Sequence, residues 1–533
     1  MKLAAVLLVA ALPATAAVAQ LPAGGRPLSL DEAIVMALGH NESILIQRES
    51  IAATEAATLR AKGVYDPALD FQASWRHGTE AINSPFSGAP GSNAGPTATT
   101  TETLFSIRQY LPTGGTVALR MDTSRISTDS EFVLLSPSYN TRVGVEFRQP
   151  LLRGLSIDTY RLGIRVAAAD QARSAASLRR EVTDTVAAVE AGYWSLASSR
   201  RAVEVREEAV TLADEQLAQT RARVEEGAAP ETELSQPLAE LERRRGEMYA
   251  ARETVSRDEN ALKRLILGAG DTAMWASRIV TTDDPNRDAE PAGGRDMDAL
   301  LRRALSDRPE LEELEADIER RRAESDFAHD TLKPGLDAFV SYDRYGLAGS
   351  VVNQDPNADP NSPFTVIVPD WIEGGLGRSY GTLGEGRFDD TRAGLVLSVP
   401  IGNRVARGNE GVARAFQRQA EAGLDGARKR VLSEVLDAAA AVETASQRVE
   451  AARAAREAAG VQLSAERDRY GAGLSTNFLV LTRQNDLSRA RLDEITALTD
   501  YRKARTELAR ATGALLEERR IEVEPAPPNG GGN

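Results

Sequence analysis

The chain has 533 residues, a formal net charge of −14 and no cysteine, which excludes disulfides, thiolate metal sites and a cysteine nucleophile. Its three histidines, His40, His77 and His329, lie far apart without the spacing of a metal or triad motif, so we predict no enzyme activity, no cofactor and no metal site. The acidic balance argues against nucleic acid as a partner.

The first predicted element is a signal peptide. Lys2 precedes the apolar run LAAVLLVAAL, which is too short to cross a bilayer as a helix, and Ala17-Val18-Ala19 forms a small-residue cleavage site. We therefore expect an exported mature chain that begins at Gln20. No later run of about 18 apolar residues is present, so no transmembrane helix is predicted.

Long helices dominate the rest of the chain. Low aromatic content (5%) with abundant alanine, arginine, glutamate and leucine is typical of long helices and coiled coils. The expected helices cover 30–62, 155–225, 232–266, 297–330, 404–470 and 476–512. At ~1.5 Å per residue the two longest reach about 100 Å each, too long for a compact globular core. A seven-residue repeat of apolar residues, Val182, Val189, Leu196 and Val203, predicts left-handed supercoiling against neighbouring helices.

Four amphipathic strands are predicted between the helices, at 69–77, 140–149, 336–345 and 391–399. Pro67 and Pro334 end the preceding helices, because proline lacks the amide hydrogen and clashes with the preceding turn. Strict alternation follows each of them, as expected for a membrane barrel with a polar lumen. The expected lipid-facing set is Leu69, Phe71, Val143, Val145, Leu336, Val340, Leu395 and Leu397. The polar segments 78–101 and 346–388, which include the glycine-rich GGLGRSYGTLGEG, are predicted as outward-facing loops.

The chain contains an internal duplication. Ala37 and Ala304 are 267 residues apart, Pro67 and Pro334 keep that offset, and Gly227 of the first hairpin precedes Gly473 of the second by 246. The offsets shrink because loops differ in length while the elements stay aligned. We predict a signal peptide at 1–19, a first repeat at 20–268, an inter-repeat linker at 269–296, a second repeat at 297–516 and a flexible C-terminal tail at 517–533.

Three short motifs occur within this duplicated unit: YDPALD from Tyr65, QPLLRG from Gln149 and RYGAGLST from Arg469. In this order and spacing the chain resembles the TolC-like outer-membrane efflux protein family. The resemblance implies a mainly α fold with membrane β strands: a homotrimer whose α-helical barrel crosses the periplasm and continues as an outer-membrane β-barrel.

The resemblance also implies a function and partners. The chain would be the outer-membrane channel of a tripartite efflux or type I secretion system in a Gram-negative bacterium, a passive exit duct through outer membrane and periplasm. Its partners would be outer-membrane lipid, a periplasmic adaptor (membrane fusion) protein and an inner-membrane pump.

One segment departs from the family pattern of two strands per copy. ETLFSIRQYLPTGGTVALRMDTSR, at 102–125, forms an additional alternating hairpin around the turn Pro112-Thr113-Gly114-Gly115. If both strands joined the barrel, each protomer would supply six strands and a trimer eighteen. The interpretation favoured from the sequence is an elaboration of the outer end of the barrel.

The turns of the two helical hairpins are the predicted docking points for the adaptor. Glycine permits the backbone geometry of a sharp helix reversal, and the turns lie at 227–230 and 473–476. The predicted docking residues are Gly227, Ala229, Gly473, Leu474 and Ser475. The alternative is that these glycines only make the turn.

The resemblance further suggests a periplasmic entrance narrowed by acidic residues just after the second hairpin turn. The matching positions here are Leu479 and Thr482, so that ring is missing from the second copy. Subtracting the offset of 246 leads to Glu233 and Gln236 in the first copy, with Glu231 close by. We hypothesise that these glutamates tune cation entry. Nearby arginines would latch the helices shut: Arg221, Arg223, Arg467 and Arg469. The alternative is a solvated helix face.

Two rival functions stay open at this stage. A periplasmic coiled-coil scaffold protein without a pore would explain the helices, although it has no use for duplicated amphipathic strands. An exported enzyme would need a phosphate-binding loop, and the glycine clusters at 268–272 and 374–386 lack the strand, helix and Lys-Ser/Thr context of one.

Overall fold

The structure is a computed structural model that describes residues 25–81, 88–91, 95–284, 296–353 and 367–523. It divides into two compact units. The sheet unit comprises the described residues of 51–174 and 313–424, and the helical unit comprises those of 1–50, 175–312 and 425–527. The predicted signal peptide and the tail beyond residue 523 lie outside the described residues.

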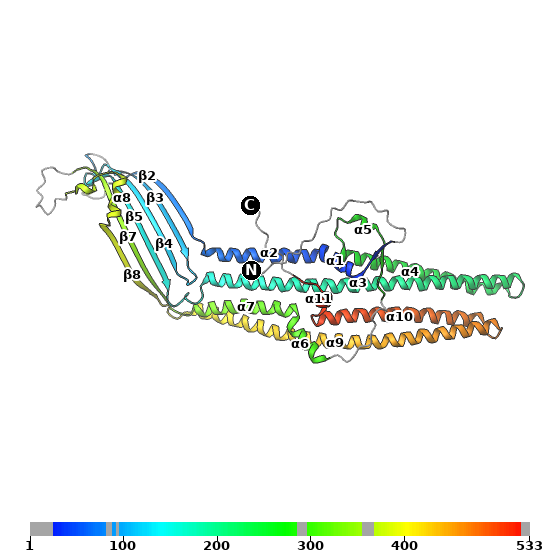
Figure 1. Ribbon diagram of the computed structural model, residues 1–533. Helices are drawn as coiled ribbons and strands as arrows, with labels where there is room; N and C mark the ends of the chain where they lie inside the picture. The colour runs from blue at the N-terminus through cyan, green and yellow to red at the C-terminus, as the bar shows by residue number, and fades with distance from the viewer. Residues whose placement is uncertain (1–24, 82–87, 92–94, 285–295, 354–366, 524–533) are drawn as a thin grey trace, which may run out of the picture. The chain divides into compact units, whose positions relative to one another are not determined.

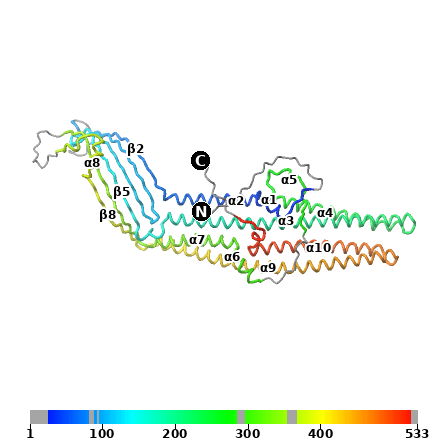
Figure 2. Tube along the Cα trace, in the orientation of Figure 1, coloured from blue at the N-terminus to red at the C-terminus, as the bar shows by residue number. Residues whose placement is uncertain are grey.

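The sheet unit contains one antiparallel sheet of six strands (Figures 1 and 2). The strands are β2 (Ala68–Thr79), β3 (Thr97–Tyr110), β4 (Thr116–Thr128), β5 (Leu135–Pro150), β7 (Gly335–Val351) and β8 (Phe388–Ser398), and they lie side by side in that order. All four predicted strands are present. Short 3-10 turns occur at η1 (Gly63–Tyr65) and η3 (Asp370–Ile372).

The predicted alternation gives this sheet one apolar and one polar face. The pairing register places all eight expected lipid-facing residues on the same face, since Leu69 pairs with Ile107, Val145 with Tyr342 and Leu397 with Leu336. This face is open to solvent in the single chain: Phe71 is 68% exposed and Leu395 67%. Exposed large apolar side chains in such a contiguous set require a lipid or protein partner.

The favoured interpretation of the additional hairpin is wrong. It forms β3 and β4, which are inserted between β2 and β5 and pair with both along their length. Their residues alternate in phase with the neighbours, so nothing in the register separates them from the sheet. Because β3 begins at Thr97, the polar segment expected at 78–101 is reduced to 80–96.

The prediction of a loop over 346–388 is also wrong in part. β7 continues to Val351, and α8 (Leu376–Glu385) is a helix packed against β7 and β5. Ser379 lies 3.0 Å from the Thr141 hydroxyl, and a Cβ at Gly346 would lie 2.1 Å from the Ser379 carbonyl oxygen. α8 is seated through small polar residues instead of an apolar stripe, which explains why the sequence pattern missed it.

Helices make up most of the described residues. Their bounds are α1 (Leu30–His40), α2 (Glu42–Lys62), α3 (Thr159–Glu225), α4 (Ser235–Ile266), α5 (Thr272–Ala276), α6 (Met297–Asp307), α7 (Pro309–Asp330), α9 (Arg404–Gly471), α10 (Asn477–Ala511) and α11 (Leu515–Glu518). The 3-10 helix η2 (Glu231–Leu234) precedes α4. Among the described residues, no helix is both long and apolar enough to cross a membrane.

Two helices predicted as continuous are each broken once. Asn41 separates α1 from α2, and its side-chain oxygen accepts hydrogen bonds from the Ser43 and Ile44 amides. Arg308 separates α6 from α7, because Pro309 disfavours helical backbone in the residue before it. At the first break the Asn41 side chain caps the start of α2, and at the second break a proline begins α7. The helical turns on either side of each break stay intact.

The break before Pro309 turns the Arg308 guanidinium into the interior of the helical unit. Arg308 is 4% exposed and binds Glu310 through two hydrogen bonds of 2.9 and 2.7 Å. It also donates to Glu434 of α9 at 2.9 Å and to the Ala511 carbonyl of α10 at 3.1 Å. One buried cation therefore joins the start of α7 to two other helices.

The seven-residue stripe is confirmed as core at three of its four positions. Val182, Val189 and Leu196 of α3 are at most 3% exposed, whereas Val203 is half-buried, and Val435, Val442 and Val449 of α9 are at most 4% exposed. Strands β1 (Arg26–Leu28) and β6 (Ile279–Thr281), the latter within the predicted linker, form a small parallel pair. Burial raises the pKa of Tyr193 to about 12, and its hydroxyl binds the Leu28 carbonyl and the Asp283 carboxylate beside this pair.

Candidate functional site

The helical unit contains two helical hairpins, α3–α4 and α9–α10, and both reverse through the same type of turn. Gly227 and Gly473 both adopt φ of +74°, a left-handed conformation that favours glycine. The Ala228 amide donates to the Arg223 carbonyl at 2.8 Å, and the Leu474 amide donates to the Arg469 carbonyl at 2.8 Å. These are Schellman caps, which satisfy the last carbonyls of each helix and reverse the chain.

The predicted docking residues lie at these turns. Gly473 and Leu474 are exposed, Leu474 by 80%, while Gly227 is exposed and Ala229 half-buried. Ser475 is half-buried, and its hydroxyl donates to the buried Glu466 carboxylate. The second turn therefore offers an apolar tip on a braced loop. Whether a partner binds there stays a prediction.

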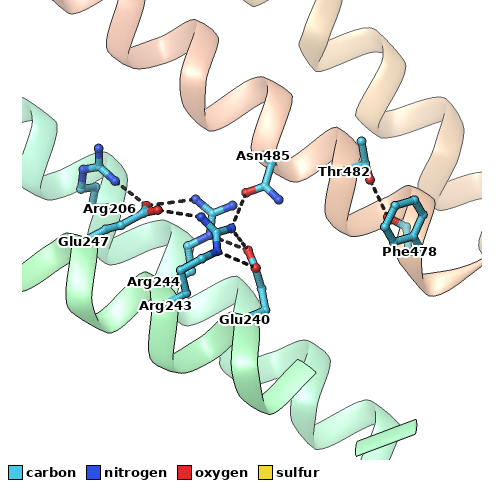
Figure 3. Close-up of polar contacts among 8 residues, drawn as sticks. All are labelled: Arg206, Glu240, Arg243, Arg244, Glu247, Phe478, Thr482 and Asn485. Atoms are coloured by element: carbon cyan, nitrogen blue, oxygen red, sulfur yellow. Dashed lines mark hydrogen bonds and ion pairs between the residues drawn. The ribbon is translucent and has the colours of Figure 1, made fainter. Parts of the chain in front are cut away.

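The predicted entrance residues lie next to these turns. Glu231 and Glu233 are exposed on η2, just beyond the first turn. Leu479 is 39% exposed in the first turn of α10, and the Thr482 hydroxyl donates to the Phe478 carbonyl at 2.8 Å within that helix (Figure 3).

The four predicted latch arginines have different surroundings. Arg223 donates to the Tyr470 hydroxyl at 3.1 Å, which joins the ends of α3 and α9. Arg469 lies 3.9 Å from Glu466, and Arg221 and Arg467 are exposed. In the described part of the single chain, none of the four forms an ion pair with Glu231 or Glu233.

A larger charged network, which sequence reasoning missed, lies further along the first hairpin (Figure 3). Glu247 of α4 accepts from Arg206 of α3 at 2.5 Å and from Arg243 at 2.6 Å. Glu240 accepts from Arg243 at 2.5 Å and from Arg244 at 2.8 Å. Arg243 also reaches the Asn485 side chain of α10 at 3.4 Å, so the network touches both hairpins.

The arginines of the network stabilise the charged form of its glutamates. Burial raises the pKa of the Glu240 carboxyl, but hydrogen bonds from Arg243 and the charge of Arg244 outweigh it, and the pKa lies below its usual value. The hydrogen bond to Glu240 raises the pKa of the Arg243 guanidinium. The run ELERRRGE at 240–247 holds these groups at helical i,i+3 and i,i+4 spacing, a signal that could have been found in the sequence.

The polar face of the sheet is the second candidate site. Arg142 of β5 lies 2.9 Å from Asp343 of β7 and 3.7 Å from Asp122 of β4. Gly144 leaves room for Asp343, since a Cβ there would lie 1.9 Å from its carboxylate. A hollow of about 690 Å³ runs along this face beside Arg142 and Tyr345. The charged and polar side chains of this face suit a hydrated surface.

Comparisons with known proteins agree with this architecture. The model of a family described as outer membrane efflux protein matches residues 116–268 and 300–514. No match was found among curated proteins. A membrane protein structure from Pseudomonas aeruginosa is 18% identical, with 91% of this chain and 90% of that chain covered and a TM-score of 0.62. The outer membrane channel CmeC of Campylobacter jejuni is 15% identical, with 91% of this chain and 86% of that chain covered and a TM-score of 0.59. The outer membrane protein VceC of Vibrio cholerae is 16% identical, with 91% of this chain and 96% of that chain covered and a TM-score of 0.59. These likenesses concern the fold.

Proposed function

The chain belongs to the outer membrane efflux protein family, and from this premise we propose that three copies form a passive exit duct that serves an adaptor and a pump. The protein is the outer-membrane channel component of an efflux system, and its family is one of channels rather than of enzymes. The observation that carries the proposal is the combination of a six-stranded sheet with one exposed apolar face and two long hairpins ending in matched turns. A pore-free scaffold has no use for the apolar face.

In this proposal the apolar sheet face contacts outer-membrane lipid, and the polar face lines the lumen. The charges around Arg142 on the polar face suit a water-filled passage. The hairpin turns point into the periplasm and bind the adaptor, which in turn binds an inner-membrane pump. The apolar, exposed Leu474 is the proposed anchor, because burying its side chain against a partner removes apolar surface from water.

Photo-crosslinking residues at Ala229 and Ser475 should capture a periplasmic protein in living cells, because both lie at the hairpin turns. The matched control is Tyr249, which is 61% exposed on α4 and lies about 20 residues, or roughly 30 Å, from the turn. Mass spectrometry of the crosslinked bands identifies the partner. Equal capture from Tyr249, or capture only from the strand loops, would argue against docking at the turns.

The entrance proposal places Glu233 of three copies around a common axis, where their charges attract cations and repel one another. Closure then needs cationic partners, and Arg469 is one of the two proposed latch residues on the second hairpin. Its support is local: Glu233 is exposed just beyond one turn, and Arg469 is exposed just before the other.

Single-channel recording tests this entrance. Glu233→Lys should reduce the preference for cations, and Arg469→Ala should raise the open probability. The controls are Glu253→Lys and Arg257→Ala, an exposed pair joined at 2.7 Å further along α4. If selectivity and gating stay unchanged in both entrance variants, these residues do not belong to the entrance.

A further inference from the structure

The sheet unit contains six strands but only four connections between strand and long helix. β2 follows α2, β5 precedes α3, β7 follows α7 and β8 precedes α9, whereas β3 and β4 are joined to each other at the helix-proximal end. We infer that the complete barrel has eighteen strands, six from each of three copies of this chain. The added hairpin then keeps the duct as wide in the membrane as in the helical tunnel. This inference rests on the proposed function.

The hairpin is integrated across the full height of the sheet. β3 and β4 contain 14 and 13 residues, against 12 in β2 and 16 in β5. One apolar row runs through four strands without a shift: Phe71 pairs with Phe105, Phe105 with Met121 and Met121 with Val143. On the polar face, Arg142 reaches Asp122 of the hairpin.

The hairpin turn is seated where the sheet meets the helices. The Leu111 amide donates to the Gly115 carbonyl at 2.8 Å, and the Gln149 side chain donates to the Thr113 carbonyl at 2.9 Å. Gly114 has φ of +83°, and a Cβ there would lie 2.6 Å from the Gly154 carbonyl oxygen. Contacts at the turn and strand pairing on both sides therefore hold the β3–β4 hairpin in the sheet.

The two edges of the sheet fit a second copy of the chain. β2 runs away from the helices and β8 runs toward them, so β8 of one copy meets β2 of the next in antiparallel orientation, like every other pair in this sheet. Phe71 and Trp75 on one edge strand and Leu395 and Leu397 on the other are all more than 60% exposed on the same face. Open apolar edges of this length invite aggregation unless they are paired.

Simple geometry supports eighteen strands. With a strand spacing of ~4.8 Å and a tilt of about 40°, eighteen strands close a ring of roughly 110 Å circumference, and twelve strands close one of roughly 75 Å. Twelve helices, four per copy, at axial spacings of ~9–10 Å form a ring of roughly 110–120 Å. The larger barrel matches the helical ring.

Disulfide mapping in the full-length, outer-membrane protein tests the strand order, and the natural chain contains no competing cysteine. The pairs Phe71→Cys with Phe105→Cys and Met121→Cys with Val143→Cys join neighbouring strands of one row. Both should crosslink nearly completely, since adjacent strands bring Cα atoms to about 5 Å. Phe71→Cys with Val143→Cys is the matched control, about 14 Å apart across three strand spacings, and should not crosslink.

Covalent links between copies test the closure. Ala73→Cys combined in turn with cysteine at Ala393, Leu395 or Leu397 scans the outer face of the two edges, and one combination should yield covalent trimers in denaturing gels. A disulfide within one copy between Phe71→Cys and Val143→Cys, or between Phe71→Cys and the neighbouring positions on β5, would overturn the inference if it formed in the assembled trimer. β2 would then border β5 directly, without β3 and β4 between them. Absence of trimers from the outer membrane with every variant would instead count against the proposed function.

Discussion

Arg308→Met should lower the free energy of unfolding by about 3 kcal/mol, because it removes one partner of a buried ion pair and leaves carboxylates without a cation. The guanidinium makes four hydrogen bonds to Glu310, Glu434 and the Ala511 carbonyl. The Glu310 and Glu434 carboxylates are partly exposed to solvent. The loss of unfolding free energy is therefore expected at the lower end of the range for fully buried ion pairs. Urea denaturation of the purified trimer, followed by circular dichroism, measures it.

The matched control is Arg303→Met in the preceding helix. Arg303 also pairs with two acids, Asp307 and Glu517, but its side chain is 36% exposed, so the loss should stay below about 1 kcal/mol. Equal losses in the two variants would show that burial of Arg308 has no special role.

The pH dependence of the Arg308→Met effect has a defined sign. Burial raises the pKa of the Glu310 carboxyl, but the hydrogen bonds from Arg308 outweigh it and leave the pKa below its usual value. The stabilisation is therefore complete above the ordinary glutamate pKa of about 4.3 and is lost as the pH falls through the lowered value. The difference between wild type and Arg308→Met should shrink below about pH 4.

Leu395→Arg should reduce assembled trimer in the outer membrane strongly. Leu395 lies on the apolar face of β8, and an arginine facing lipid near the bilayer midplane costs about 2–4 kcal/mol in each copy. Heat-modifiable migration of the trimer in outer-membrane fractions measures assembly.

Val396→Arg is the matched control, because the adjacent residue points to the opposite, lumen-facing side of the same strand. Its neighbour across the pair is Asp337, so a cation there meets water and an acid and should be tolerated. Equal sensitivity at both positions would refute the assignment of the two faces.

The strands and long helices could be predicted from the sequence because their periods are strong and local. Alternation around Leu69 and Leu395 and the seven-residue repeat through Val189 each specify an element and its buried or exposed face. Helix breaks at Asn41 and Arg308 were missed because one cap or one proline interrupts an otherwise helical pattern.

The place of the hairpin β3–β4 could not be read from its own residues. Its alternation fits either a sheet wall or an outer elaboration, and the decision depends on long-range pairing of Phe71 with Phe105 and Met121 with Val143. α8 was missed because Ser379 and Thr382, rather than apolar residues, form its buried side. In the proposed trimer, the surroundings of Glu233 include residues of the other two copies, so they could not be predicted from one chain.

Planar-bilayer recording of the purified full-length protein tests the central claim most directly. An outer-membrane duct predicts discrete conductance steps from the trimer, with a higher open probability in Arg469→Ala. Bilayers that demonstrably contain the trimer, yet show no conductance from wild type or from Arg469→Ala, would contradict the assignment of this chain as a channel.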